Sequence, residues 1–127
     1  MQYMLDLIER APVNLPCGYF HVLLRDSSLR RRRIGSCGFK GKPDAAGAVE
    51  IGWSLLSENR HKGYGTELVA ALVSYAFSAP SVTAVIAEAM PQLTPSIRVL
   101  VKNGFVHVGE GSDPGSIRFR CPRLPVN

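Results

Sequence analysis

The sequence lacks a hydrophobic run long enough to cross a membrane. No apolar stretch approaches the roughly 20 residues that a transmembrane helix needs. Residues 1–6 also lack the basic and apolar regions of a secretory signal peptide. We therefore expect a cytoplasmic protein that is neither exported nor inserted in a membrane.

Cysteine is scarce and is not arranged as a metal site. The three positions, Cys17, Cys37 and Cys121, are odd in number and far apart. Structural zinc sites use closely spaced pairs of cysteine or histidine ligands. We therefore expect no metal and reduced thiols, as is usual in the cytosol.

The chain also lacks internal repeats and any linker that would divide it. It has 127 residues, enough to bury a core, and 46% of them are hydrophobic against 20% charged. That balance is typical of a folded globular protein rather than a disordered one. Residues 1–127 are therefore expected to form a single domain.

The excess of positive charge is moderate, and much of it comes from one run of arginines. The formal net charge is +5, and residues 30–33 are all Arg, shortly after the turn-type residues Asp26, Ser27 and Ser28. Two interpretations are open: a solvated hairpin tip, or a patch that binds nucleic acid or an acidic partner. No aromatic residues interleave with the run and no nucleic-acid motif accompanies it, so we favour the solvated turn.

The order of predicted elements is that of a mixed α/β domain. A short amphipathic helix is expected at residues 3–10, where apolar side chains recur at helical spacing. Branched and aromatic residues predict strands at 19–24, 34–39 and 48–56, joined by short links as in an antiparallel meander. A wide apolar stripe predicts a helix at 67–77, and the apolar run at 82–89 predicts a buried strand parallel to 48–56.

The last part of the chain predicts one more helix and two more strands. Thr94 and Pro95 are typical of a helix N-cap and first position, and Asn103 with Gly104 is typical of a helix end. Strands are expected at 105–109 and 116–121. The predicted fold class is therefore α/β with a mixed sheet, in which antiparallel strands precede a parallel β-α-β core.

A glycine-bearing turn joins the strand at 48–56 to the helix at 67–77. It reads Arg60-His61-Lys62-Gly63-Tyr64-Gly65-Thr66. A helix N-terminus has unpaired N–H groups and a positive dipole end, both of which attract phosphate. Glycine lets the backbone take positive φ or approach a ligand closely, and the basic residues before it add positive charge. We therefore interpret the turn as a pyrophosphate-binding loop.

Three sequence blocks together resemble the GNAT superfamily of N-acetyltransferases. Arg60-x-x-Gly63-x-Gly65 is similar to that family's pyrophosphate loop, and Glu50-Ile51-Gly52-Trp53 is similar to the strand before it. The distal helix and its exit are similar to the signature of the ribosomal-protein-alanine acetyltransferase-like group: Ser96-Ile97-Arg98-Val99-Leu100, then Lys102-Asn103-Gly104-Phe105. The resemblance covers roughly residues 19–121.

The resemblance implies a GNAT fold, an acetyl-coenzyme A (acetyl-CoA) cofactor and direct transfer of the acetyl group to a primary amine. Backbone amides of the loop would hold the pyrophosphate, so its expected contacts are Arg60, His61, Lys62, Gly63, Tyr64, Gly65 and Thr66. The pantetheine arm would lie where the strands at 48–56 and 82–89 splay apart, paired with backbone groups of Trp53, Ser54 and Leu55. Ser96 and Lys102 complete the expected cofactor contacts.

Glu50 is the expected catalytic base. An attacking amine must lose a proton, and a carboxylate in this strand could take it directly or through water. The alternative for Glu50 is an outward-facing side chain paired with an arginine, and Glu88 is the second candidate base. Leu100 replaces the Tyr that many family members use as general acid, and Leu93 replaces an Asn before the signature Ser.

The beginning of the chain departs from the family pattern. If residues 3–10 are a helix, the family's first strand and first helix are missing. The Tyr19 strand would then be an unpaired edge, which invites pairing with another chain. We therefore expect a homodimer, or another partner chain, at this edge.

Two functional hypotheses follow. The first is an N-acetyltransferase that moves the acetyl group from acetyl-CoA to a protein N-terminus or a small-molecule amine. The alternative is a coenzyme A-binding module with little or no catalysis, which the shortened N-terminal region and Leu100 favour.

Overall fold

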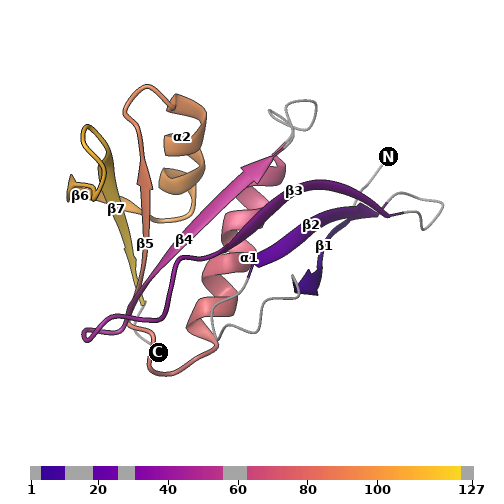
Figure 1. The fold of residues 1–127 in the computed structure, drawn as a ribbon, viewed down its shortest axis with the longest axis horizontal. Coiled ribbons are helices and arrows are strands. Elements are labelled where there is room, and N and C mark those ends of the chain that lie inside the picture. Colours follow the sequence, from indigo (N-terminus) through magenta and orange to yellow (C-terminus); the bar gives the residue numbers. More distant parts are fainter. Residues whose placement is uncertain (1–3, 11–18, 26–30, 56–62, 124–127) are drawn as a thin grey trace.

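The computed structural model describes residues 4–10, 19–25, 31–55 and 63–123, with side chains from residue 33 onward. The described elements form one mixed sheet with two helices (Figure 1). The strands are β1 (Met4–Arg10), β2 (Tyr19–Arg25), β3 (Arg31–Phe39), β4 (Ala48–Leu55), β5 (Ala84–Ala89), β6 (Val106–Glu110) and β7 (Ile117–Pro122). The helices are α1 (Tyr64–Phe77) and α2 (Thr94–Lys102).

The strands follow the order β1-β2-β3-β4-β5-β7-β6 across the sheet. β1 to β4 form an antiparallel meander. β4 and β5 are joined through α1 and run parallel, whereas β7 is antiparallel to both β5 and β6. The predicted α/β class, with a meander followed by a parallel β-α-β core, is confirmed.

The helix expected at residues 3–10 is wrong, because this segment is strand β1. It pairs antiparallel with β2, with Leu5 opposite Leu24 and Arg10 opposite Phe20. Periodicity alone does not distinguish a short helix from a strand in so short an apolar run. The edge of β2 supplies backbone partners that an isolated helix of this length lacks. A strand therefore precedes β2 after all, and β2 is not the unpaired edge from which we expected a homodimer.

Three smaller predictions about element ends also change. Residues 31–33 of the arginine run lie within β3 and not at a hairpin tip, while Arg30 lies outside the described residues. Helix α1 begins at Tyr64, three residues before its expected start, because Gly63 acts as its N-cap. Leu93 is the N-cap of α2, so Thr94 and Pro95 occupy its first turn. Gly104 has the left-handed backbone (φ 86°) expected after the helix.

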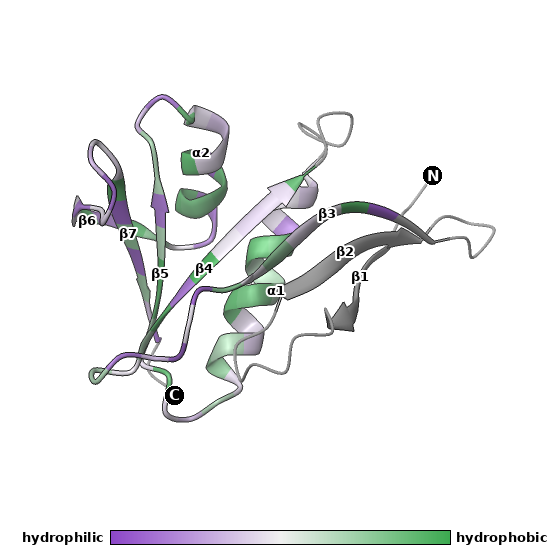
Figure 2. Cartoon of the chain, viewed as in Figure 1, coloured by the Kyte–Doolittle hydropathy of each residue, from purple (hydrophilic) through white to green (hydrophobic). Residues whose placement is uncertain are grey.

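The hydrophobic core lies mainly between α1 and the sheet. Hydrophobic residues recur along α1 and β5 (green in Figure 2), and Leu68, Val69 and Leu72 of α1 are at most 1% exposed. They pack in one cluster with Val49 and Ile51 of β4 and with core residues of the neighbouring strands. No helix in the described ranges is long and apolar enough to span a membrane.

β4 and β5 are paired over only part of their length. Their parallel register runs from Ala48 opposite Ala84 to Glu50 opposite Ile86, although both strands continue beyond it. β4 stays paired with β3 as far as Leu55, and β5 stays paired with β7 as far as Ala89. Each strand is thus held by its outer neighbour while the two diverge, as Figure 1 shows.

Arg123 fixes the C-terminal end of α1 against the sheet. Its guanidinium donates to the carbonyl oxygens of Phe77 (3.0 Å), Ala79 (2.8 Å) and Val82 (2.9 Å). It also lies 4.9 Å from the centroid of the Phe77 ring, a cation–π contact. The last turn of α1 has no basic residue of its own. Arg123 therefore satisfies carbonyls at the end of α1 and favours the negative end of the helix dipole.

Replacing Arg123 is expected to destabilise the domain. Arg123→Ala should lower the free energy of unfolding by about 1.5–3 kcal/mol, because part-buried carbonyls lose a charged donor. Arg120→Ala, at an exposed position on β7, is the control and should change it by less than about 0.5 kcal/mol. Urea unfolding at pH 7 measures both. Equal losses in the two variants would contradict this role of Arg123.

Candidate functional site

The divergence of β4 and β5 leaves part of the inner edge of β4 without a strand partner. The Lys40 N–H donates to the Glu50 carbonyl across the β3–β4 pair at 2.8 Å. Since backbone groups of successive residues point to opposite edges of a strand, Gly52 and Ser54 also direct theirs to β3. Trp53 therefore directs its N–H and carbonyl into the gap beside β5. This backbone edge can pair with an extended amide chain, as an added strand would.

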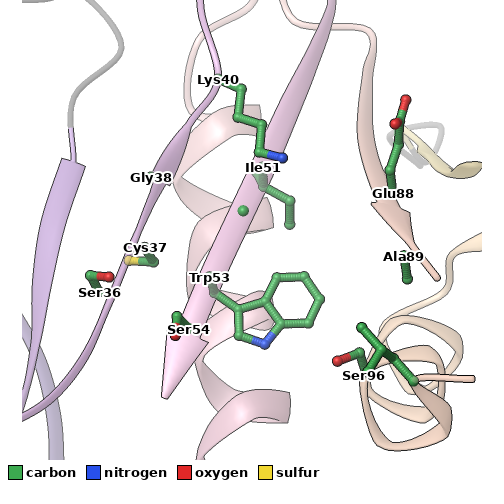
Figure 3. Close-up of a pocket in the computed structure, with 12 residues that line it drawn as sticks. Ser36, Cys37, Gly38, Lys40, Ile51, Trp53, Ser54, Glu88, Ala89 and Ser96 are labelled. Carbon is green, nitrogen blue, oxygen red and sulfur yellow. The ribbon is translucent and has the colours of Figure 1, made fainter. Parts of the chain in front are cut away.

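An open cavity of about 330 Å³ lies at this gap. Figure 3 shows Trp53 extending from β4 toward α2, with the Ser96 hydroxyl of α2 directed back at the ring. The lining comes from β3, β4, the end of β5 and α2: Ser36, Cys37, Gly38, Lys40, Ile51, Gly52, Trp53, Ser54, Glu88, Ala89, Leu93 and Ser96. The structure therefore places three predicted cofactor residues, Trp53, Ser54 and Ser96, around one cavity.

Ser54 and Leu55 occupy this region in different ways from Trp53. The Ser54 carbonyl faces β3, since it would collide with a Cβ added to Gly35. Only the exposed Ser54 side chain is thus directed to the cavity. The half-buried Leu55 packs against the core, and its side chain lies 3.8 Å from the Cβ position of Gly65. Leu55 thus joins the end of β4 to the beginning of α1.

The N-terminus of α1 begins beside the gap. Gly63 is its N-cap, with φ 82°, and has no side chain that could cap the first turn. Among the described residues, the first N–H groups of α1 are therefore available to an anion, as the phosphate-loop prediction requires. A Cβ on Gly63 would meet no atom of the described residues within 4 Å, so this glycine serves backbone conformation and, on the described side, leaves the approach open.

Gly65 serves a different purpose from Gly63. It is buried, and an added Cβ would lie 3.3 Å from Val99 of α2 and 4.0 Å from the Trp53 indole nitrogen. Its lack of a side chain lets α1 pack closely on α2 and β4. Of the two glycines in the loop, the structure thus assigns Gly63 to the open approach and Gly65 to packing.

The remaining loop and signature residues lie around this helix end. Tyr64 packs against the core, and the Thr66 carbonyl accepts a 3.2 Å hydrogen bond from the Asn103 side-chain amide. Lys102 is exposed in the last turn of α2, next to Asn103 in the chain. Arg60, His61 and Lys62 lie outside the described residues. The loop residues and the signature thus meet at the first turn of α1.

Glu50 lies where the two strands part and is paired with a lysine. It is the last β4 residue in register with β5, and its carboxylate lies 3.6 Å from the Lys40 ammonium. Its side chain is 26% exposed and is not part of the cavity lining, whereas Lys40 is. The expected alternative, an ion pair, is thus present with lysine in place of arginine. Glu50 nevertheless lies next to the cavity, because its ion-pair partner Lys40 lines it.

Glu88 is held by hydrogen bonds and is not a free base. Arg118 donates to its carboxylate from Nε (3.1 Å) and Nη2 (2.7 Å), and Ser112 donates from its N–H (2.8 Å) and hydroxyl (3.0 Å). Burial alone raises the pKa of Glu88, but the hydrogen bonds from Arg118 and Ser112 outweigh it and the pKa is lowered. Figure 3 shows the carboxylate turned away from Trp53 and Ser96.

Cys37 and Leu100 are unsuited to catalysis. Cys37 is 2% exposed, and burial raises the pKa of its thiol to about 12, so it is almost entirely a neutral thiol at physiological pH. Leu100 is fully buried in the core and supplies no proton donor. In the described ranges, no group of three His, Cys, Asp or Glu side chains could hold a metal ion.

Sequence reasoning missed three residues that shape the site. Lys40 enters the cavity because β3 and β4 pair in one particular register, which the sequence does not reveal. Asn103 was recognised only as a helix-ending residue and as part of the family signature, yet its amide joins α2 to α1. Arg118 was predicted only as part of the strand at 116–121, and its position opposite Glu88 depends on the β5–β7 pairing.

The thiol of Cys37 is expected to be unreactive in the native protein. In a Cys17→Ser, Cys121→Ser background, about one Cys37 in 10⁴ would be thiolate at pH 8, against roughly a quarter for an ordinary thiol. Native-state labelling with a disulfide reagent should thus be at least about 10³-fold slower than for the same variant in concentrated guanidinium chloride. Equal rates would contradict the buried position. The thiol of the unfolded chain ionises from about pH 8.5 upward, whereas the buried thiol, with its raised pKa, stays neutral. The free energy of unfolding should therefore also fall from about pH 8.5 upward.

Residues 3–106 match the acetyltransferase (GNAT) domain family. The chain is 27% identical over 106 residues to the uncharacterized N-acetyltransferase p20 of Bacillus licheniformis, covering 84% of this chain and 58% of that protein. It is 34% identical over 73 residues to the uncharacterized N-acetyltransferase YjdG of Bacillus subtilis strain 168, covering 58% and 44%. The chain thus spans about half the length of the curated relatives it matches.

Solved structures of acetyltransferases share the fold. Aminoglycoside acetyltransferase AAC(6')-Ib in complex with coenzyme A superposes with a TM-score of 0.70 at 25% identity, covering 84% of this chain and 66% of that chain. Ribosomal-protein-S5-alanine acetyltransferase from Vibrio fischeri has a TM-score of 0.70 at 24% identity, covering 84% and 61%. The family match extends over more than half of the sequence and includes both diverging strands and the glycine turn. The chain belongs to the GNAT acetyltransferase domain family.

Proposed function

We propose that this domain binds acetyl-CoA in the gap between β4 and β5 and transfers the acetyl group to a primary amine. One observation carries the proposal: beyond Glu50, the edge of β4 that carries the Trp53 backbone parts from β5, and β4 leads toward the N-terminus of α1, whose N-cap Gly63 has no side chain. A strand rises about 3.3 Å per residue, so Glu50 and Leu55 are about 16 Å apart along β4. The gap therefore suits an extended ligand with amides along its length and phosphate at one end.

The phosphate end of the ligand is assigned to α1. The N–H groups of its first turn and the helix dipole favour an anion there, and Gly63 leaves the approach open. Arg60, His61 and Lys62 remain proposed contacts from the loop, and Lys102 a proposed contact from α2. Trp53 offers its backbone to the pantetheine arm, and Ser96 faces the same arm across the cavity.

The acetyl end of the ligand is assigned to the point where the strands part, beside Glu50. The amine nitrogen attacks the thioester carbonyl, a C–N bond forms and the C–S bond breaks. The proton lost by the amine passes to Glu50, directly or through water. The buried Leu100 offers no acid, so the leaving thiolate takes its proton from solvent. The reaction needs no covalent enzyme intermediate, in keeping with the unreactive Cys37.

Structural relatives support the choice of ligand. Solved structures of AAC(6')-Ib contain coenzyme A, acetyl-CoA with paromomycin, or ribostamycin with coenzyme A. The acceptor class of this chain is a separate question, because those acceptors belong to that enzyme.

We also propose a cytoplasmic location. A homodimer would have to pair through an edge other than β2, which β1 already occupies.

Gly63 offers a test of the phosphate site with a matched control. Gly63→Ala forces a left-handed alanine at φ 82°, and Gly41→Ala does the same at φ 91°; neither added Cβ has an atom within 4 Å. Both variants should lose about 1–2 kcal/mol of stability. Only Gly63→Ala should weaken acetyl-CoA binding, by about tenfold in calorimetry. Equal affinities of the two variants for acetyl-CoA, or no binding of acetyl-CoA by the wild-type protein, would contradict the proposed phosphate site.

Glu50 can be tested by its effect on turnover. Glu50→Gln is expected to lower kcat about 10²–10⁴-fold, with acetyl-CoA affinity unchanged. Glu110→Gln, at an exposed position on β6, is the control. Release of the coenzyme A thiol with a panel of amines gives the rate. Unchanged kcat in Glu50→Gln would exclude Glu50 as the base, and absence of thiol release with bound acetyl-CoA would favour the alternative of a binding module.

A further inference from the structure

One face of the β3–β4 pair forms an open platform beneath the cavity. Three successive cross-strand pairs build it: Ser36 with Ser54, Gly38 with Gly52, and Lys40 with Glu50. Because side chains alternate along a strand, these six share the face opposite Ile51 and Cys37, which pack in the core shared with α1. All of them except Glu50 line the cavity. We call this face the β3–β4 platform.

The platform is small and polar, and Lys40 provides its cation. The Gly38–Gly52 pair has no side chains, so the backbone itself forms the middle of the surface. The Lys40 side chain lies across Gly52, whose added Cβ would be 2.9 Å from the lysine Cε and 3.8 Å from its Nζ. Figure 3 shows the ammonium directed toward the gap between β4 and β5. The lysine side chain is 57% exposed, so its charge is accessible from the cavity.

In the described part of the chain, each carboxylate beside the cavity lies next to a basic side chain. Glu88 accepts hydrogen bonds from Arg118 and Ser112, and Glu50 lies 3.6 Å from Lys40. At that distance Glu50 does not take up the donors of the ammonium, which has three N–H groups. A second anion can therefore bind Lys40, whereas a polycation finds no unpaired carboxylate in the described lining. The net charge of +5 adds a field of the same sign.

We propose that the acetyl acceptor is an amine that also carries a carboxylate, and that Lys40 binds this carboxylate on the β3–β4 platform. The inference rests on the proposed acetyl transfer. The amine then faces the gap, near Glu50, while the carboxylate lies on Lys40, and the serine hydroxyls of the platform lie beyond the Gly38–Gly52 pair. Free amino acids and similar small amino acids belong to this class. Polyamines and aminoglycosides do not, despite the structural likeness to an aminoglycoside acetyltransferase.

The class can be tested with pairs of acceptors that differ in one group. L-alanine, L-phenylalanine and L-glutamate are each compared with the corresponding α-amide, and spermidine and kanamycin serve as polycations. The amine of each amide is less basic than that of the acid, so more of it is unprotonated at neutral pH. Intrinsic reactivity therefore favours the amides. For the wild-type protein with saturating acetyl-CoA, kcat/KM measured by thiol release should nevertheless be at least about tenfold higher for the acid of the best pair, which corresponds to about 1.4 kcal/mol.

Variants of Lys40 connect this preference to the platform. Lys40→Met should bring the acid-to-amide ratio to one or below, mainly through a higher KM for the acid. Lys40→Arg keeps the charge and should retain most of the preference. Lys42→Met, at an exposed position outside the cavity lining, is the control and should retain it fully. A Lys40→Met protein with an unchanged ratio, or a wild-type protein that prefers amides or polycations, would overturn the inference.

A binding measurement separates this inference from the proposed reaction. Calorimetry in the presence of coenzyme A compares each N-acetyl amino acid with its N-acetyl amide. If no acceptor is turned over but the acids bind more tightly to wild-type protein and not to Lys40→Met, the carboxylate site stands and the acetyl transfer fails. If no acceptor is turned over and the acids show no advantage in binding, the carboxylate site is overturned as well.

Discussion

The short parallel pairing between β4 and β5 is the constraint on which the site depends. Three residue pairs, ending at Glu50 opposite Ile86, hold the strands together, and beyond them each strand is held only by its outer neighbour. Longer pairing would close the gap and use the backbone of Trp53 in a continuous sheet. No pairing would leave α1 without a fixed position relative to β5. The partial pairing thus keeps the edge of β4 free and directs it to the N-terminus of α1.

The helices preserve this geometry by close contact. Gly65 brings α1 to within packing distance of Val99, and the Asn103 amide bonds to Thr66 in α1 and Val99 in α2. Arg123 fixes the other end of α1. The helix whose N-terminus would hold phosphate is therefore fixed at both ends. A rigid helix end is what preorganised binding of an anion requires, since less conformational freedom is lost on binding.

Most of the fold can be predicted from the sequence, because local residue patterns determine most of its helices and strands. The strands from β2 onward and the amphipathic α1 each have a local signal, and they lie where expected apart from shifts of a few residues at their ends. Strand β1 was missed because its run of apolar residues fits both periods and its identity depends on pairing with β2. The site was only partly predictable for the same reason. The Lys40–Glu50 and Glu88–Arg118 pairs arise from strand register, which no single segment encodes.

Amide hydrogen exchange tests the central claim, that the free edge of β4 and the first turn of α1 bind one extended ligand. The amides at stake are those of Trp53 in β4 and of Tyr64, Gly65 and Thr66 in α1. Exchange is measured at these positions with and without saturating acetyl-CoA. We expect slower exchange in both segments together, with β6 unchanged as the internal reference. Protection of α1 without Trp53, or binding of acetyl-CoA that protects neither segment, would contradict it.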